Sequence, residues 1–218
     1  MPQLNHLPES PLPSKRGLRA RLFAKAMARV EDRHDALIAP YKRRLLTDLH
    51  GDVLEIGPGA GINLAYYAPD VRWIGVEPNP HMYPYLHAAA AAQGRALDLR
   101  TSYAEALPAA DNSMDAVVST LVLCSVGNLE QSLAEVRRVL KPGGKYVFIE
   151  HVAAPAGSGL RQLQNGVRPL WSFFSDGCHP NREIWRHIEA AGFDDATIEH
   201  FNVMLPIVKP HIAGFAIK

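Results

Sequence analysis

The chain has 218 residues, 47% hydrophobic and 21% charged, with 23 lysines and arginines against 22 aspartates and glutamates. These values fit one globular domain with a full core, and they exclude an intrinsically disordered chain and a disulfide-stapled miniprotein. Two cysteines, Cys124 and Cys178, are too few for a disulfide framework. Residues 1–14 show no apolar core of signal-peptide length, and no stretch is apolar enough to span a membrane. We therefore expect a cytoplasmic protein that is at most peripheral on a membrane.

Charge is distributed unevenly along the chain. Residues 15–30 contain six basic side chains and no acidic one. Four apolar residues recur there at a spacing of four: Leu18, Leu22, Ala26 and Val30. This pattern predicts an amphipathic helix, which would either lie on an anionic membrane surface or pack its apolar face on its own domain. We treat residues 1–30 as an N-terminal basic segment and residues 31–218 as the domain. A nucleic-acid interface is disfavoured because Phe23 is the only aromatic residue among these charges.

From residue 31 onward the hydrophobic pattern predicts alternating helices and strands. In chain order these are helix 31–50, strand 52–56, helix 61–68, strand 71–76, helix 80–93, strand 97–102, strand 116–120, helix 130–140, strand 146–150, helix 182–191, strand 197–203 and strand 212–218. The early strands are continuously apolar, which is typical of a parallel sheet covered by helices on both faces. With no internal repeat and no long linker, the sequence predicts a single α/β domain.

A glycine-rich turn follows the first predicted strand. Gly57, Gly59 and Gly61 allow a tight turn and a close approach of the main chain to a ligand. Ile62 stands where the dinucleotide-binding pattern G-x-G-x-x-G has its third glycine, which disfavours a nicotinamide oxidoreductase. Glu77 ends the second predicted strand, 20 residues after Gly57, where it can accept both ribose hydroxyls of a nucleoside. The turn and the acid together predict a nucleoside site at the carboxyl ends of the strands.

These residues belong to two sets of motifs that resemble known enzymes. The first set is Glu55–Gly61, Glu77, Ala104–Pro108, Asp115–Val118 and Leu140–Gly144. In order and spacing it resembles the class I S-adenosylmethionine-dependent methyltransferases. The second set is Thr120–Val126, Glu150–Ala154, Asp176–His179 and Pro210–Lys218. It is similar to the methyltransferase-like alkyl-thiol S-methyltransferases. The resemblance implies an α/β fold with a doubly wound, Rossmann-like, seven-stranded and mostly parallel sheet, an antiparallel last strand and helices on both faces.

The resemblance also implies which residues bind the cofactor, S-adenosylmethionine. They are Glu55, Gly57, Gly59, Gly61, Asn63, Glu77, Pro78, Met82, Ala104, Glu105, Thr120 and Leu121. In this scheme Glu55 orients the cofactor's ammonium group, Glu77 holds the ribose, and Pro78 and Met82 pack near the adenine. Tyr103 departs from the family pattern, which often has an aspartate there to contact the exocyclic amine of the adenine.

Catalysis of methyl transfer mainly requires that the acceptor is held in line with the S–CH₃ bond, because the sulfonium methyl is already activated. A thiol attacks as the thiolate, so a nearby base would help. His151, at the end of the fifth predicted strand, is the first candidate for this base, and Asp176 and His179 could close the acceptor pocket; the alternative for each is a purely structural role in its loop. The 54-residue gap between Cys124 and Cys178 argues against a zinc site, so we expect no metal.

The sequence thus predicts an S-adenosylmethionine-dependent methyltransferase (EC 2.1.1) for a small lipophilic acceptor, with a thiol favoured and S-adenosylhomocysteine as product. Residues 155–179 are rich in large apolar side chains and predict either a lid over the acceptor or a packing helix. The alternative is N- or C-methylation of a lipid or quinone-type substrate at a membrane surface, with residues 15–30 as the contact. A non-enzymatic module that only binds the cofactor is disfavoured because the motifs are intact. We expect a small-molecule partner and no nucleic acid, and the sequence carries no indication of an oligomeric state.

Overall fold

The computed structural model describes residues 17–218, apart from the side chains of residues 30–33. Residues 1–16 lie outside the described residues; they include Lys15 and Arg16 of the predicted basic segment and the stretch that lacks signal-peptide features. Within the described part of the chain, no helix has the length and apolar character needed to cross a membrane.

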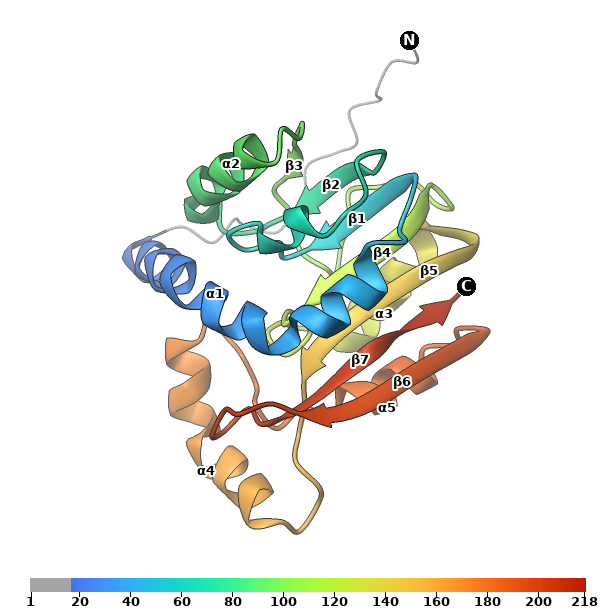
Figure 1. Cartoon of the computed structure of the whole chain (residues 1–218). Helices are drawn as coiled ribbons and strands as arrows, with labels where there is room; N and C mark the ends of the chain where they lie inside the picture. The colour runs from blue at the N-terminus through green and yellow to red at the C-terminus, as the bar shows by residue number, and fades with distance from the viewer. Residues whose placement is uncertain (1–16) are drawn as a thin grey trace.

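Seven strands form one sheet in the order β3-β2-β1-β4-β5-β7-β6 (Figure 1). The strands are β1 (Asp52–Ile56), β2 (Arg72–Val76), β3 (Asp98–Arg100), β4 (Met114–Thr120), β5 (Leu140–His151), β6 (Asp195–Asn202) and β7 (Pro210–Ile217). The first five pair in parallel, whereas β7 runs antiparallel to both β5 and β6. The predicted doubly wound, mostly parallel sheet with an antiparallel last strand is confirmed.

Helices cover both faces of this sheet. They are α1 (Leu18–Leu46), α2 (Tyr83–Ala92), α3 (Leu129–Val139), α4 (Gly159–Phe174) and α5 (Ile184–Ala190), with short 3-10 helices η1 (Ile62–Ala65) and η2 (Pro80–Met82). Successive residues of a strand point to opposite faces. On β4, Val117 packs in the core beneath α3 and α5, whereas Ala116 and Val118 pack in the core beneath α1 and α2. The helix predicted over residues 61–68 is reduced to η1.

The first helix differs from the prediction in its extent and its inward face. α1 is continuous from Leu18, so it crosses the predicted boundary at residue 30 without a break. Leu18 and Leu22 of the predicted apolar stripe are exposed, whereas Ala20 and Ala24 are buried. Alanine lets a helix approach its neighbours closely, so the small residues pack inward and the leucines face outward.

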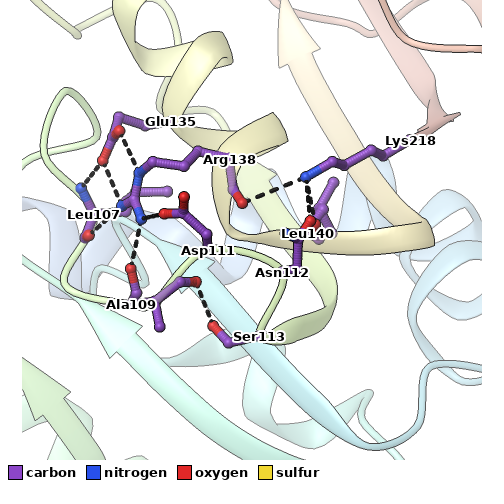
Figure 2. A network of polar contacts seen from close by, with 10 residues as sticks. Leu107, Ala109, Asp111, Asn112, Ser113, Glu135, Arg138, Leu140 and Lys218 are labelled. Carbon is purple, nitrogen blue, oxygen red and sulfur yellow. Dashed lines mark hydrogen bonds and ion pairs between the residues drawn. The ribbon is translucent and has the colours of Figure 1, made fainter.

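The loop between β3 and β4 is anchored by Arg138 on α3 (Figure 2). The Arg138 guanidinium donates hydrogen bonds of 2.7–2.9 Å to four partners: the carbonyls of Leu107 and Ala109 and the carboxylates of Asp111 and Glu135. Lys218 closes the same region, because its Nζ donates to the carbonyl of Leu140 at 2.7 Å. The network holds a loop whose earlier part, residues 102–105, reaches the site described next.

Candidate active site

A cavity of about 260 Å³ opens at the carboxyl ends of β1, β2 and β4. Eleven of the twelve residues assigned to the cofactor line it: Glu55, Gly57, Gly59, Asn63, Glu77, Pro78, Met82, Ala104, Glu105, Thr120 and Leu121. Gly61 is buried beside it, where a Cβ would stand 3.0 Å from Leu86 Cδ2. The structure therefore brings together residues that the sequence spreads over four loops.

The glycine-rich turn has a backbone that other residues cannot adopt without strain. Gly57 has φ 59° and Gly59 has φ 57°, both in the left-handed region. A Cβ at Gly57 would also lie 2.6 Å from Cγ2 of Val122, a residue of the loop after β4. A side chain at Gly57 would therefore clash with Val122, so glycine is needed here for the loop after β4 to pack this closely against the turn.

Glu55 and Asn63 form a buried polar pair on the cavity wall. Glu55 accepts hydrogen bonds from Asn63 Nδ2 at 2.8 Å, Tyr67 OH at 2.9 Å and Trp73 Nε1 at 2.8 Å. Burial raises the pKa of Glu55, and these three donors oppose that shift. Asn63 Nδ2 also reaches Thr120 Oγ1 at 3.0 Å, whereas its buried Oδ1 has no hydrogen-bond partner among the described residues. This oxygen on the cavity wall is an acceptor for a cationic ligand group.

Glu77 is held at the end of β2 with only 6% of its surface exposed. Its Oε1 accepts a hydrogen bond from the backbone N–H of Asn79 at 2.8 Å. The Asn79 side chain caps η2 and donates to the carbonyl of Ala20 at 3.1 Å, which ties α1 to this edge of the sheet. The carboxylate is therefore fixed on the cavity wall at the place where the sequence predicts a ribose.

Glu105 connects the loop after β3 to the start of α3. Its Oε1 accepts from the backbone N–H groups of Gly127 and Asn128, at 2.7 and 2.9 Å. Its Oε2 is buried and has no hydrogen-bond partner in the described structure. Tyr103, next to it on the cavity wall, has a raised pKa because it is partly buried. The loop thus presents an aromatic ring at the position where the resemblance noted in the sequence leads us to expect a carboxylate.

The end of β4 is strained where it meets the cavity. Leu121 has φ 58°, a conformation that is costly for a branched side chain. Its N–H donates to the Ile149 carbonyl at 2.9 Å, and Glu150 Oε2 accepts from the N–H of Val122 at 2.9 Å. The buried Glu150 carboxylate therefore holds the floor of the cavity in place.

The three candidate catalytic residues lie in different places. Asp176 lines the cavity. His151 is buried behind the wall, with its Nε2 3.1 Å from Cys178 Sγ. His179 also lies outside the cavity lining, and its backbone N–H donates to the Cys124 carbonyl at 2.9 Å. The 54-residue gap used above to argue against a zinc site does not keep the two cysteines apart, because the fold brings both to His151.

Helix α1 supplies a cavity wall that the sequence reasoning missed. Its contributing residues are Phe23, Met27, His34, Asp35, Ile38 and Lys42. Asp35 accepts from Lys42 Nζ and from Tyr66 OH, each at 2.7 Å, so the charges are paired across the wall. His34 lies 3.2 Å from His211, nitrogen to nitrogen, and burial lowers its pKa to about 4. The sequence feature that could have revealed this wall is the presence of polar residues, such as His34, among the apolar residues of a long helix.

Comparison with known proteins identifies the class of this enzyme. A family model described as a methyltransferase domain matches residues 54–148. The thiol S-methyltransferase TMT1B of Rattus norvegicus is 39% identical over 209 residues, which cover 92% of this chain and 84% of that protein. Thiol S-methyltransferase TMT1A of Homo sapiens is 37% identical over 195 residues, covering 83% of this chain and 80% of that protein. The chain belongs to the class I S-adenosylmethionine-dependent methyltransferases.

Solved structures support the fold of this methyltransferase. A chain from a complex between the Haloferax volcanii Trm112 methyltransferase activator and a methyltransferase superposes with a TM-score of 0.71, at 16% identity, over 94% of this chain and 99% of that one. The [4+2]-cyclase SpnF superposes with a TM-score of 0.68, at 15% identity, over 97% and 98%. Since the second protein is described as a cyclase, the fold alone does not define the reaction, and the argument must come from the site.

The residues present fit S-adenosylmethionine. Asn63 Oδ1 offers an acceptor without a partner among the described residues, Gly57 and Gly59 line the cavity, and Glu77 is fixed at a strand end. These features match a ligand with a cationic amino-acid part and a ribose.

Proposed function

We propose that this methyltransferase transfers a methyl group to the sulfur of a small lipophilic thiol. The observation that carries this proposal is 39% identity to a thiol S-methyltransferase over 92% of the chain. The cavity supports it, because Phe23, Met27 and Ile38 of α1 contribute apolar side chains to its lining. An apolar wall suits a lipophilic acceptor and a transition state in which charge is dispersed.

A second candidate is C- or N-methylation of a quinone-type or lipid substrate. Demethylmenaquinone methyltransferase of Deinococcus radiodurans is 34% identical over 111 residues, but these cover only 50% of this chain and 45% of that protein. Acceptor sites are built from elements outside the shared cofactor motifs. The match to the thiol S-methyltransferase covers 92% of this chain and so includes these elements, which favours a thiol acceptor.

The chain's own residues divide the work between two ends of the cavity. When bound, S-adenosylmethionine supplies an activated sulfonium methyl group and leaves as S-adenosylhomocysteine. We assign the methionine part to the glycine turn with Glu55 and Asn63, and the ribose to Glu77. We assign the adenine to Pro78, Met82 and the Ala104–Glu105 loop, and the floor beneath the sulfonium to Thr120 and Leu121.

On the acceptor side, Asp176 is our candidate for the group that removes the thiol proton. The thiolate is the nucleophile, so the S–H bond must break before the new S–C bond forms in line with the departing sulfur. Asp176 lines the cavity, whereas His151 and His179 do not and are assigned as positioning residues for its loop. Asp176→Asn should lower the rate about 100-fold at neutral pH, with less loss for thiols of low pKa.

A panel of acceptors tests the proposal. Alkyl and aryl thiols are compared with amines, phenols and hydroquinones, and the methylated products are quantified by mass spectrometry. We expect thioether formation from lipophilic thiols at rates well above those for the other classes. Turnover of hydroquinones or amines alone would replace the thiol by the second candidate.

We also propose a peripheral contact between the described part of the basic segment and an anionic membrane. Leu18 and Leu22 of α1 and Phe173 and Phe174 of α4 are large apolar side chains that are exposed. Arg19 links the two helices, because its guanidinium lies 4.7 Å from the centre of the Phe173 ring and donates to the Ser172 carbonyl at 3.3 Å. Exposed apolar side chains flanked by basic ones fit an anionic lipid surface.

Vesicle sedimentation tests this contact. The full chain should bind phosphatidylserine-containing vesicles, less at high salt, and bind little to neutral vesicles. The double variant Phe173→Ser/Phe174→Ser should lose binding, whereas Leu37→Ser, further along α1, should retain it. Equal sedimentation of the double variant and the parent would show that this surface is not the contact.

A further inference from the structure

Three side chains that bind metals in other proteins meet behind the cavity wall. Cys124 comes from the loop after β4, His151 from the end of β5, and Cys178 from the loop after α4. One ligand atom from each lies within 4.8 Å of the other two. All three are buried, with exposed fractions of 2%, 5% and 7%. Two thiols and an imidazole form a donor set that suits zinc and other soft divalent ions.

The separations are close to those of a tetrahedral site. Zinc binds sulfur at about 2.3 Å and imidazole nitrogen at about 2.1 Å, which places neighbouring ligand atoms roughly 3.5–3.8 Å apart. His151 Nε2 lies 3.1 Å from Cys178 Sγ, and no pair in the cluster exceeds 4.8 Å. Small side-chain rotations are therefore enough to place an ion between them.

The surroundings also indicate a ligand. His151 Nδ1 is buried without a hydrogen-bond partner among the described residues, and the imidazole otherwise contacts the weakly hydrogen-bonding sulfurs of Cys178 and Cys124. Without an ion, the fold leaves this imidazole poorly satisfied. Trp171 Nε1 donates to Cys178 Sγ at 3.3 Å, a contact that would stabilise a metal-bound thiolate from the outer shell.

We propose that Cys124, His151 and Cys178 bind a Zn²⁺-class ion. Binding releases two thiol protons, so the ion and two thiolates together carry no net charge, and a fourth position remains for water or another ligand. Ser125 and Asp176, each close in sequence to one cysteine ligand, line the cavity. The ion therefore ties together the loops that form the acceptor end, whichever acceptor is methylated.

Metal content tests the proposal directly. The untagged full chain is purified with a phosphine reductant, dialysed against Zn²⁺, desalted and measured by elemental analysis. We expect about one zinc per chain. Cys124→Ser and Cys178→Ser should each abolish stoichiometric binding, whereas His179→Gln, beside the cluster, should leave it unchanged. Trp171→Phe should weaken zinc binding roughly 10–100-fold, as loss of an outer-shell partner does.

Cobalt substitution of the unmutated chain gives an answer that does not depend on how the variants fold. Co²⁺ should produce thiolate-to-metal charge-transfer bands and the visible bands of a tetrahedral site. Added Zn²⁺ should displace the Co²⁺, so that these bands disappear, and should raise the melting temperature of the protein. A folded, reduced chain that takes up neither ion would overturn the proposal, as would a Cys124–Cys178 disulfide in protein isolated anaerobically without reductant. Neither result would affect the thiol assignment, because product formation from the acceptor panel is measured separately.

Discussion

The two ends of the sheet differ in how completely their polar groups are hydrogen-bonded. Around Arg138, the guanidinium, Asp111 and Glu135 all have partners, and the left-handed residue there is Asn112, with φ 52°. At the cavity, Asn63 Oδ1 and Glu105 Oε2 are buried without hydrogen-bond partners in the described structure. The left-handed residues Leu121 and Asp176 also lie on its wall. The unpaired acceptor oxygens and the strained residues Leu121 and Asp176 therefore lie at the end that must receive a ligand, whereas the unpaired atom beside Arg138 in the described structure is a donor, Arg137 Nε.

The largest expected effect, on the free energy of unfolding, comes from removing the hydrogen-bond network of Arg138. Arg138→Met keeps the apolar stem but removes the hydrogen bonds of the guanidinium and leaves Glu135 without its cation. We expect the free energy of unfolding to fall by about 3 kcal/mol in a urea titration, because hydrogen bonds to charged groups are lost. Arg186→Met is the matched control, since this more exposed arginine also pairs with a glutamate three residues away; it should cost less than about 1 kcal/mol. Equal losses in the two variants would contradict the comparison.

A change at the cavity end should affect ligand binding more than stability. Glu77→Ala should weaken S-adenosylhomocysteine binding by about 1–3 kcal/mol, because a charged hydrogen-bond acceptor is removed from the proposed ribose site. Calorimetric titration measures this, with the exposed Glu189→Ala as a control that should bind normally. An unchanged affinity in Glu77→Ala would mean that the ribose lies elsewhere.

The cofactor end was more predictable from sequence than the acceptor end. The glycine turn, Glu77 and the residues after β4 follow strands whose apolar pattern is clear, and parallel strands bring their carboxyl ends to one edge. Local pattern therefore located Gly57, Gly59 and Glu77, and the family resemblance supplied the other eight of the eleven cavity residues. The inward face of α1 could not be read in this way, because exposed Leu22 is larger and more apolar than buried Ala24. Only the packing of α1 on the sheet decides which of them is covered.

The cluster of Cys124, His151 and Cys178 was also invisible to sequence spacing. Metal-ligand motifs are recognised when ligands lie close together in the chain. Here each ligand comes from a different segment, and the segments meet only because β4 pairs with β5 and the loop after α4 folds back onto the loop after β4. The contact is a consequence of topology.

A pH titration sharpens the comparison at the α1 wall. Burial is the main cause of the lowered pKa of His34, about 4 against 6.5 unfolded; His151 and Lys42 lower it further, and Asp35 opposes them. As pH falls from 6.5 towards 4, the unfolded chain binds a proton that the folded chain does not, so stability is lost across this window and none of this loss occurs above it. We expect the parent to lose about 1–2 kcal/mol more than His34→Gln between pH 7 and pH 4, measured by urea unfolding. Parallel curves would show that His34 is not desolvated. His211, whose pKa is also lowered, contributes to both proteins.

The smallest expected effect concerns two of the left-handed positions, Leu121 and Asn112. Asparagine tolerates the left-handed conformation better than leucine, and Asn112 already adopts it near the Arg138 network. The variant Leu121→Asn introduces the same residue type at the cavity. We expect the free energy of unfolding to rise by up to about 1 kcal/mol, while methyl transfer slows because the cavity floor loses its apolar side chain. The reciprocal variant Asn112→Leu should lose about 1 kcal/mol and keep normal affinity for S-adenosylhomocysteine, since it adds strain far from the cavity. If Leu121→Asn were instead both less stable and fully active, the strain at this position would have no connection with ligand binding.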